Sequence, residues 1–87
     1  MEVVYWEGAK EDLKHWAKSG DKQIQKKIIQ LLNDIILHPE TGFGKPEQLK
    51  HELAGYWSRR INSEHRILYK FTKDTVYIYS LRGHYEK

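Results

Sequence analysis

The sequence predicts an α+β domain in which an N-terminal strand and a helical hairpin are followed by an antiparallel β-sheet packed against the helices. Two observations predict this fold. Apolar residues recur with a helical period over residues 9–35, and after a loop rich in glycine and proline they alternate with polar residues, as in strands. The 87 residues are enough for one small domain, so we assign residues 1–87 to a single unit.

The N-terminal part contains a short strand and two helices. The run Val3–Trp6 is β-prone. From about Glu7 the period changes, and one helical face carries Ala9, Leu13, Trp16 and Ala17.

Gly20 suits the position just after the first helix, and Asp21 suits the N-cap of the second. The second helix has an apolar face and ends near His38, because Pro39 disfavours helical geometry in the residue before it. That face carries Ile24, Ile28, Leu31, Leu32 and Ile35.

The C-terminal part reads as a loop and three strands. Residues Glu40–Pro46 form the loop, and the strand-like runs are Tyr56–Ile61, Arg66–Phe71 and Thr75–Leu81. Alternation in the middle run places Ile67, Tyr69 and Phe71 toward the helices and Arg66 on the opposite face.

The register of the first hairpin stays open at this point. A three-residue turn at residues 62–64 pairs Arg60 with Arg66, whereas a two-residue turn pairs Ile61 with Arg66 and sends Arg60 to the other face. Like charges that face each other across strands are destabilising, and a bound anion would compensate for them.

Positive charge is concentrated in the second half of the chain. Residues 1–44 contain six lysines and seven acidic residues, whereas residues 45–87 contain nine basic and five acidic residues, including all four arginines. The arginine fork matches phosphate geometry, so this asymmetry indicates an anionic partner such as nucleic acid. A merely solvated sheet face would give the same excess of charge.

Composition excludes several other classes of protein. The chain has no cysteine, which rules out disulfides, thiolate metal sites and a cysteine nucleophile. No apolar run approaches the roughly 20 residues of a membrane span, and the first residues lack the pattern of a signal peptide. We therefore expect a cytoplasmic protein with no membrane association.

Some residues suit metal-independent RNA cleavage, which needs a base, an acid and cations around the phosphate. His84 suits the acid or base role because its ordinary pKa is near neutrality. Glu47 and Arg66 are a candidate carboxylate and a candidate phosphate ligand. Each also has a plainer interpretation: a frayed terminal histidine, an acid in a first helical turn, and an arginine paired with Glu64 or Asp74.

The other histidines lack metal-ligand spacing and are interpreted as surface or structural residues; they are His15, His38, His51 and His65. Tyr56 and Trp57 are interpreted as packing residues. No P-loop, dinucleotide fingerprint or nucleophile elbow is present.

The block G-K-P-E-Q-L-K-H-E-L-A-G-Y-W-S-R-R-I-N-S-E-H-R-I-L-Y, with R-G-H-Y near the end, closely resembles the YoeB/Txe branch of the RelE toxin superfamily. The helical pattern K-K-I-x-x-L-L-x-D agrees, and the resemblance covers essentially the whole chain. It implies a reduced microbial-ribonuclease fold and a toxin that cuts mRNA in the ribosomal A site, with no metal or cofactor.

The resemblance also implies roles for individual residues. Glu47 resembles the general base, His84 the general acid and Arg66 the cation that stabilises the pentavalent transition state. Supporting positions that bind phosphate or orient the mRNA match Lys50, Arg60 and Tyr85, with Arg59 as the alternative to Arg60 for the arginine that faces the site. Tyr56 stands where family members often have Phe, and Glu86 and Lys87 extend beyond the usual terminal tyrosine.

The partners that the resemblance implies are a cognate YefM/Axe-like antitoxin, acting through its C-terminal segment, and the 70S ribosome with its mRNA. Operator DNA would be bound only through the antitoxin complex, and the toxin itself would be a homodimer.

Two other functions fit parts of the pattern. A non-catalytic RNA-binding or ribosome-binding protein would need the arginines and Lys50 but neither Glu47 nor His84. A gyrase inhibitor of the ParE type shares the fold on analogy but lacks the acid–base pair.

Overall fold

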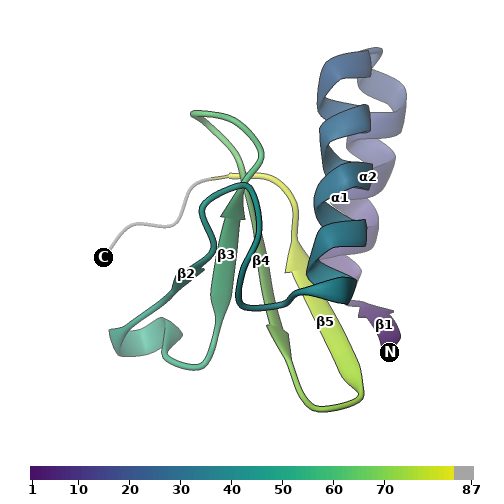
Figure 1. The fold of residues 1–87 in the computed structure, drawn as a ribbon. Helices are drawn as coiled ribbons and strands as arrows, with labels where there is room; N and C mark the ends of the chain where they lie inside the picture. Colours follow the sequence, from purple (N-terminus) through teal and green to yellow (C-terminus); the bar gives the residue numbers. More distant parts are fainter. Residues whose placement is uncertain (84–87) are drawn as a thin grey trace.

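The computed structural model of the chain describes residues 1–83 and shows a helical hairpin packed on a five-stranded sheet (Figure 1). In chain order the elements are β1 (Glu2–Tyr5), α1 (Glu7–Ser19), α2 (Lys22–Leu37), β2 (Glu47–Gln48), the 3-10 turn η1 (His51–Leu53), β3 (Trp57–Arg60), β4 (Arg66–Phe71) and β5 (Thr75–Ser80). Both predicted helices and all four predicted strands are confirmed, and each of these four strands begins and ends within one residue of its prediction.

The strand order is β1-β5-β4-β3-β2, and one pairing differs from the prediction. β1 runs parallel to β5, so the sheet is mixed rather than antiparallel. The physical reason is that the chain passes from β1 through the two helices before it returns to the sheet. A long connection of this kind allows a parallel partner, whereas a tight turn does not. The short strand β2 was not predicted, because two residues are too few to show an alternating pattern.

The hydrophobic core lies between the helices and one face of the sheet. Ile67 and Tyr69 are fully buried there, as their alternation along β4 predicted, and Phe71 packs against the edge of the core. The Trp16 indole nitrogen donates to the carbonyl of Leu81 (2.9 Å), which ties α1 to the end of β5. The other members of the core cluster are Ala9, Ile28, Leu31, Ile35, Ile61, Val76 and Ile78.

The helix ends follow the sequence signals. Gly20 adopts the left-handed conformation that ends α1 (φ 76°), and the Asp21 carboxylate accepts the backbone N–H of Ile24 (3.1 Å) at the start of α2. Among residues 1–83, no helix is long and apolar enough to cross a membrane.

A buried arginine holds the loop that follows α2. The side chain of Arg59 points from β3 toward α2 and is fully buried. Its guanidinium donates to the Asp34 carboxylate (2.6 Å) and to backbone carbonyls of the loop, including those of Thr41 (2.8 Å) and Phe43 (3.0 Å). It donates to the carbonyl of His38 as well, so one side chain holds the loop from His38 to Phe43.

Tyr69 completes this network from β4. Its hydroxyl accepts from Arg59 Nε (3.1 Å) and donates to the carbonyl of Pro39 (2.6 Å). Burial raises the pKa of Tyr69 above its ordinary value. The hydroxyl therefore stays protonated and donates its hydrogen bond to the Pro39 carbonyl.

The same loop approaches α2 and β3 so closely that only glycine fits at two positions. A Cβ on Gly42 would lie 1.9 Å from the Asp34 carboxylate, and one on Gly44 would lie 2.6 Å from Leu31. Gly44 also has φ 82°, and its carbonyl accepts the backbone N–H of Arg60 (2.6 Å). The loop is therefore a packed segment that leads into β2 at a fixed position.

We expect Gly44→Ala to lower the free energy of unfolding by clearly more than Gly20→Ala, measured by urea denaturation. Both glycines have left-handed φ angles, but nothing lies within 4 Å of a Cβ at Gly20. Gly20→Ala should therefore cost only the conformational penalty of about 1–2 kcal/mol. Gly44→Ala should add an overpacking cost of about 1–3 kcal/mol. Equal losses would show that the loop yields to the added methyl group.

Candidate active site on the helix-free face

The face of the sheet opposite the core has no helix of residues 1–83 packed on it, and we call it the helix-free face. Strand register arranges its residues in rows. Glu47 of β2 lies opposite Ser58, and Ser58 lies opposite Leu68. In the next row Arg60 lies directly opposite Arg66. The register that was left open from sequence is therefore the one with the three-residue turn, closed by the Ile61 N–H bond to the His65 carbonyl (2.9 Å).

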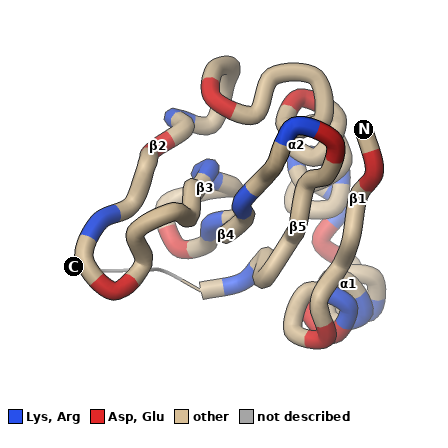
Figure 2. Tube along the Cα trace, turned by 90° about the horizontal axis from the view of Figure 1, so that it is seen from below, with Lys and Arg blue, Asp and Glu red and all other residues tan. Residues whose placement is uncertain are grey.

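The arginine pair gives this face its electrostatic character. Two guanidinium groups on paired residues repel each other unless negative charge lies between or above them. In the charge-coloured trace, basic stretches of β3 and β4 lie side by side (Figure 2), and Lys50 lies two residues after the end of β2. An anion with several oxygens, such as a phosphate diester, matches this arrangement.

Glu47 lies at the edge of the same face. It occupies β2 and not a first helical turn, so the plainer interpretation of this acid as a helix-terminal charge is wrong. Glu47 is exposed. Arg66 lies two strands away and two residues further along, in the next row, which corresponds to about 12 Å between Cα atoms. A phosphate and its ribose fit between a carboxylate and a guanidinium at that separation.

The backbone on both sides of Glu47 and Lys50 is strained. Within residues 1–83, the non-glycine residues with left-handed φ angles are Lys45 (53°) and His51 (60°), one on each side of this segment. Lys45 also precedes Pro46, a position that favours extended geometry. Strain of this kind persists only where surrounding contacts impose it, and it is concentrated at functional sites.

At Gly83 the chain returns to the start of β4, next to Arg66. The Gly83 carbonyl accepts the backbone N–H of Arg66 (3.0 Å), and the Gly83 N–H donates to Nδ1 of His65 (3.0 Å). The His65 ring packs edge-on against Trp16, with centroids 4.9 Å apart. His65 is therefore structural, as expected, and it fixes the residue that precedes His84. His84 and Tyr85 themselves lie outside the described residues.

The expectation that Arg59 is an alternative substrate ligand needs correction. Arg59 and Arg60 are neighbours on a strand, so their side chains point to opposite faces. Arg59 is fully buried in the network with Asp34, whereas Arg60 is exposed and lies opposite Arg66. Arg60 is therefore the member of the doublet that faces the candidate site.

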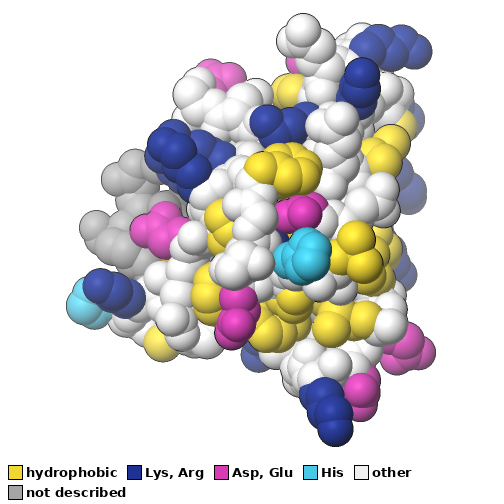
Figure 3. Space-filling model, viewed as in Figure 1, with side chains coloured by type: hydrophobic (Ala, Val, Ile, Leu, Met, Phe, Trp, Pro, Cys, Tyr) yellow, Lys and Arg dark blue, Asp and Glu magenta, His cyan; other side chains and the backbone are white. Residues whose placement is uncertain are grey.

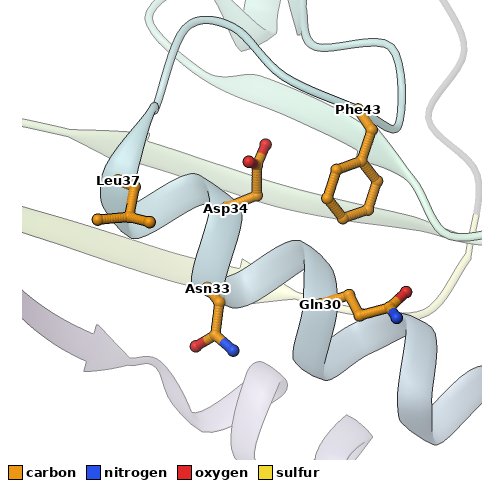
Figure 4. Close-up of a pocket in the computed structure, with 5 residues that line it drawn as sticks. All are labelled: Gln30, Asn33, Asp34, Leu37 and Phe43. Carbon is orange, nitrogen blue, oxygen red and sulfur yellow. The ribbon is translucent and has the colours of Figure 1, made fainter.

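The helix side has a separate hollow that the sequence did not indicate. Gln30, Asn33, Asp34 and Leu37 of α2 line it together with Phe43 of the loop (Figure 4). On this side of the molecule hydrophobic side chains are visible between charged ones (Figure 3). The hollow contains none of the predicted site residues. Among residues 1–83, no three His, Asp or Glu side chains gather as metal ligands would.

Comparison with known proteins gives consistent matches over nearly the whole chain. Residues 5–85 match the family model described as YoeB-like toxin of bacterial type II toxin-antitoxin system. Toxin YoeB of Streptomyces coelicolor is 46% identical over 85 residues, which cover 98% of this chain and 100% of that protein.

Solved structures agree with these matches. The YoeB/ParE toxin from Agrobacterium tumefaciens superposes with a TM-score of 0.91 at 36% identity, covering 98% of this chain and 100% of that one. The YoeB dimer from Staphylococcus aureus gives a TM-score of 0.87 at 41% identity and 98% coverage of both chains. The S. aureus protein is also known in a heterotetrameric complex with YefM.

The two neighbouring arginines should respond differently to the same substitution. We expect Arg59→Met to lower the free energy of unfolding by about 3–5 kcal/mol, because it leaves Asp34 and several carbonyls without their donor. Arg60→Met, the matched control, should change it by no more than about 0.5 kcal/mol. Chemical denaturation of both variants measures the difference, and equal losses would contradict the assignment of Arg59 to the core.

We expect His65→Phe to free the Gly83 amide while it keeps a ring against Trp16. Loss of the acceptor should cost about 1–3 kcal/mol and speed hydrogen exchange at Gly83. His15→Phe is the control, because His15 also packs edge-on against Trp16 (4.8 Å). Unchanged exchange at Gly83 in His65→Phe, measured by NMR, would show that this hydrogen bond does not hold the end of the chain.

Proposed function

Because the chain belongs to the YoeB-like toxins of bacterial type II toxin–antitoxin systems, we propose that it is a ribosome-dependent endoribonuclease. It cleaves mRNA in the A site by general acid–base chemistry, without a metal ion, and so inhibits translation in the cytoplasm. The observation that carries this proposal is the placement of Glu47 and the Arg60–Arg66 pair on one helix-free face.

In the proposed reaction the Glu47 carboxylate takes the proton of the ribose 2′-hydroxyl, and that oxygen attacks the adjacent phosphorus. His84 gives a proton to the 5′-oxygen as its bond to phosphorus breaks. The products are an end with a 2′,3′-cyclic phosphate and an end with a 5′-hydroxyl. No water or metal-bound oxygen is needed in this step, because the nucleophile belongs to the substrate.

The cations stabilise the transition state. Arg66 and Arg60 neutralise the charge that builds up on the non-bridging oxygens of the pentavalent phosphorus, and the sheet holds them in place before the reaction. Lys50 contacts a neighbouring phosphate, and Tyr85 orients the mRNA. Two features support the fixed geometry: the strained residues on either side of Glu47 and Lys50, and the hydrogen bonds of Gly83 to Arg66 and His65.

The partners follow from the family and from charge. We infer that a YefM-like antitoxin neutralises the protein through an acidic C-terminal segment, as charge complementarity with the arginine pair requires. The S. aureus relative supports this partner and a homodimeric toxin. Contact with operator DNA would then occur only through the antitoxin complex.

We expect Glu47→Gln and His84→Gln to reduce the rate of cleavage by about 10²–10⁴-fold while the protein keeps its fold, because each removes one proton-transfer group. Primer extension on a defined mRNA, with and without ribosomes and with EDTA, gives the rate and the position of new 5′ ends. Glu52→Gln is the matched control, since Glu52 is an exposed acid in η1, next to the site segment.

New ends at the A-site codon that need ribosomes and vanish in both variants would support the proposal. Translation that stops without new ends would favour a protein that blocks the ribosome by occupancy. Wild-type rates in either variant would remove that residue from its proposed role.

A further inference from the structure

The helix-free face carries a second cluster, formed by three aromatic side chains and a lysine. Trp6 stacks on Tyr79 with ring centroids 5.0 Å apart and planes 20° apart, and Tyr56 meets Tyr79 edge-on at 5.0 Å. Lys70 Nζ lies 5.1 Å from the centroid of Tyr56 and 5.9 Å from that of Tyr79. We call these four residues the aromatic row.

The aromatic row adjoins the proposed active site. Lys70 lies two residues beyond Leu68 and four beyond Arg66 on β4, so all three side chains share one face. The rise along a strand places the Cα of Lys70 about 13 Å from that of Arg66. Tyr79 precedes Ser80, which pairs with Leu68 in the row that contains Glu47. A single strand of nucleic acid that crosses the arginine pair therefore reaches the aromatic row by continuing along the sheet.

The row is not part of the hydrophobic core. None of its members belongs to the core cluster, which lies on the other face. Trp6 is 50% exposed although one of its ring faces lies against Tyr79. An indole that is fixed on one side and accessible on the other offers a flat surface on which a nucleobase stacks.

Lys70 contributes a positioned charge. Its ammonium group is held over two tyrosine rings, so less side-chain entropy is lost when it meets an anion than for a freely rotating lysine. Aromatic surfaces beside a fixed cation, continuous with a pair of arginines, match the alternation of bases and phosphates in a single strand of nucleic acid.

We propose that the aromatic row is a subsite for single-stranded RNA that binds the nucleotides next to the scissile phosphate. A base stacks on Trp6, and a phosphate lies at Lys70. This inference rests on the proposed function, because it extends the same RNA site. It assigns substrate contacts to residues beyond Glu47, Lys50, Arg60, Arg66, His84 and Tyr85.

The test uses a short, fluorescein-labelled 2′-O-methyl RNA, which has no 2′-hydroxyl to attack, so binding is measured without cleavage. We expect Trp6→Leu to weaken binding about tenfold to a hundredfold by fluorescence anisotropy. Phe43→Leu is the control, since Phe43 is an exposed aromatic residue (43%) on the helix side. Thermal unfolding checks that both variants remain folded.

Lys70 provides an independent measurement. Lys70→Gln should lower the slope of log affinity against log salt by about 0.7, the value for one phosphate on a single strand. Lys26→Gln on α2, an exposed lysine of the helix side, should leave the slope unchanged. Lys70→Gln keeps the inference testable if Trp6→Leu proves unstable.

The outcomes separate this inference from the proposed function. RNA binding that depends on Trp6 and Lys70 supports the subsite even if the wild-type protein fails to cleave mRNA on ribosomes. Normal cleavage by the wild type, with RNA affinity unchanged in both variants, overturns the subsite and leaves the nuclease proposal intact. The subsite is also overturned if the wild type does not bind the RNA at low salt, or if both variants lose only the binding of an acidic antitoxin peptide.

Discussion

The position of the candidate site depends on one buried interaction, the contact of Arg59 with Asp34 and with the loop that follows α2. The loop has little apolar surface of its own, so hydrophobic burial alone does not fix its path. The guanidinium provides that fixation by binding loop carbonyls between His38 and Phe43 and the Asp34 carboxylate of α2. A charge this deeply buried is tolerated because its donors meet acceptors. The loop then delivers the chain to β2, where Glu47 lies.

On the helix-free face, repulsion between two arginines is balanced against packing of the core. Arg60 lies opposite Arg66. Like charges that face each other across strands are destabilising, and a register shifted by one residue would separate these two. That shift sends Arg60 to the other face and would also turn Ile61 and the buried Arg59 out of the core, which costs far more. The core therefore enforces the register, and the register in turn enforces the arginine pair. A concentrated positive charge is maintained by packing on the opposite side of the same strands.

Local signals in the sequence were sufficient for the helices, their caps and the strand limits, because periodicity, Gly20, Asp21 and Pro39 act within a few residues. Features that depend on residues far apart in the sequence could not be predicted from these local signals. The parallel pairing of β1 with β5 joins the two ends of the chain, and β2 exists only because β3 pairs with it. Burial of Arg59 contradicts the usual exposure of arginine, and it becomes understandable only with Asp34 and the loop in place. The chemistry of single residues indicated Glu47, Arg66 and His84 as candidates, and the resemblance supplied their roles. The fold then separated Arg59 from Arg60.

The strained backbone around β2 fits the proposed role of Glu47 as a general base. A two-residue strand has few hydrogen bonds, so by itself it would fray and leave the Glu47 carboxylate mobile. The left-handed residues Lys45 and His51 bend the chain sharply at both ends of this segment. The N–H of Leu49 donates to the carbonyl of Tyr56 (2.9 Å) and holds the segment against the start of β3. Strain at the ends and pairing in the middle restrict Glu47 to few positions, and proton transfer requires such restriction because it depends on the distance between two heavy atoms.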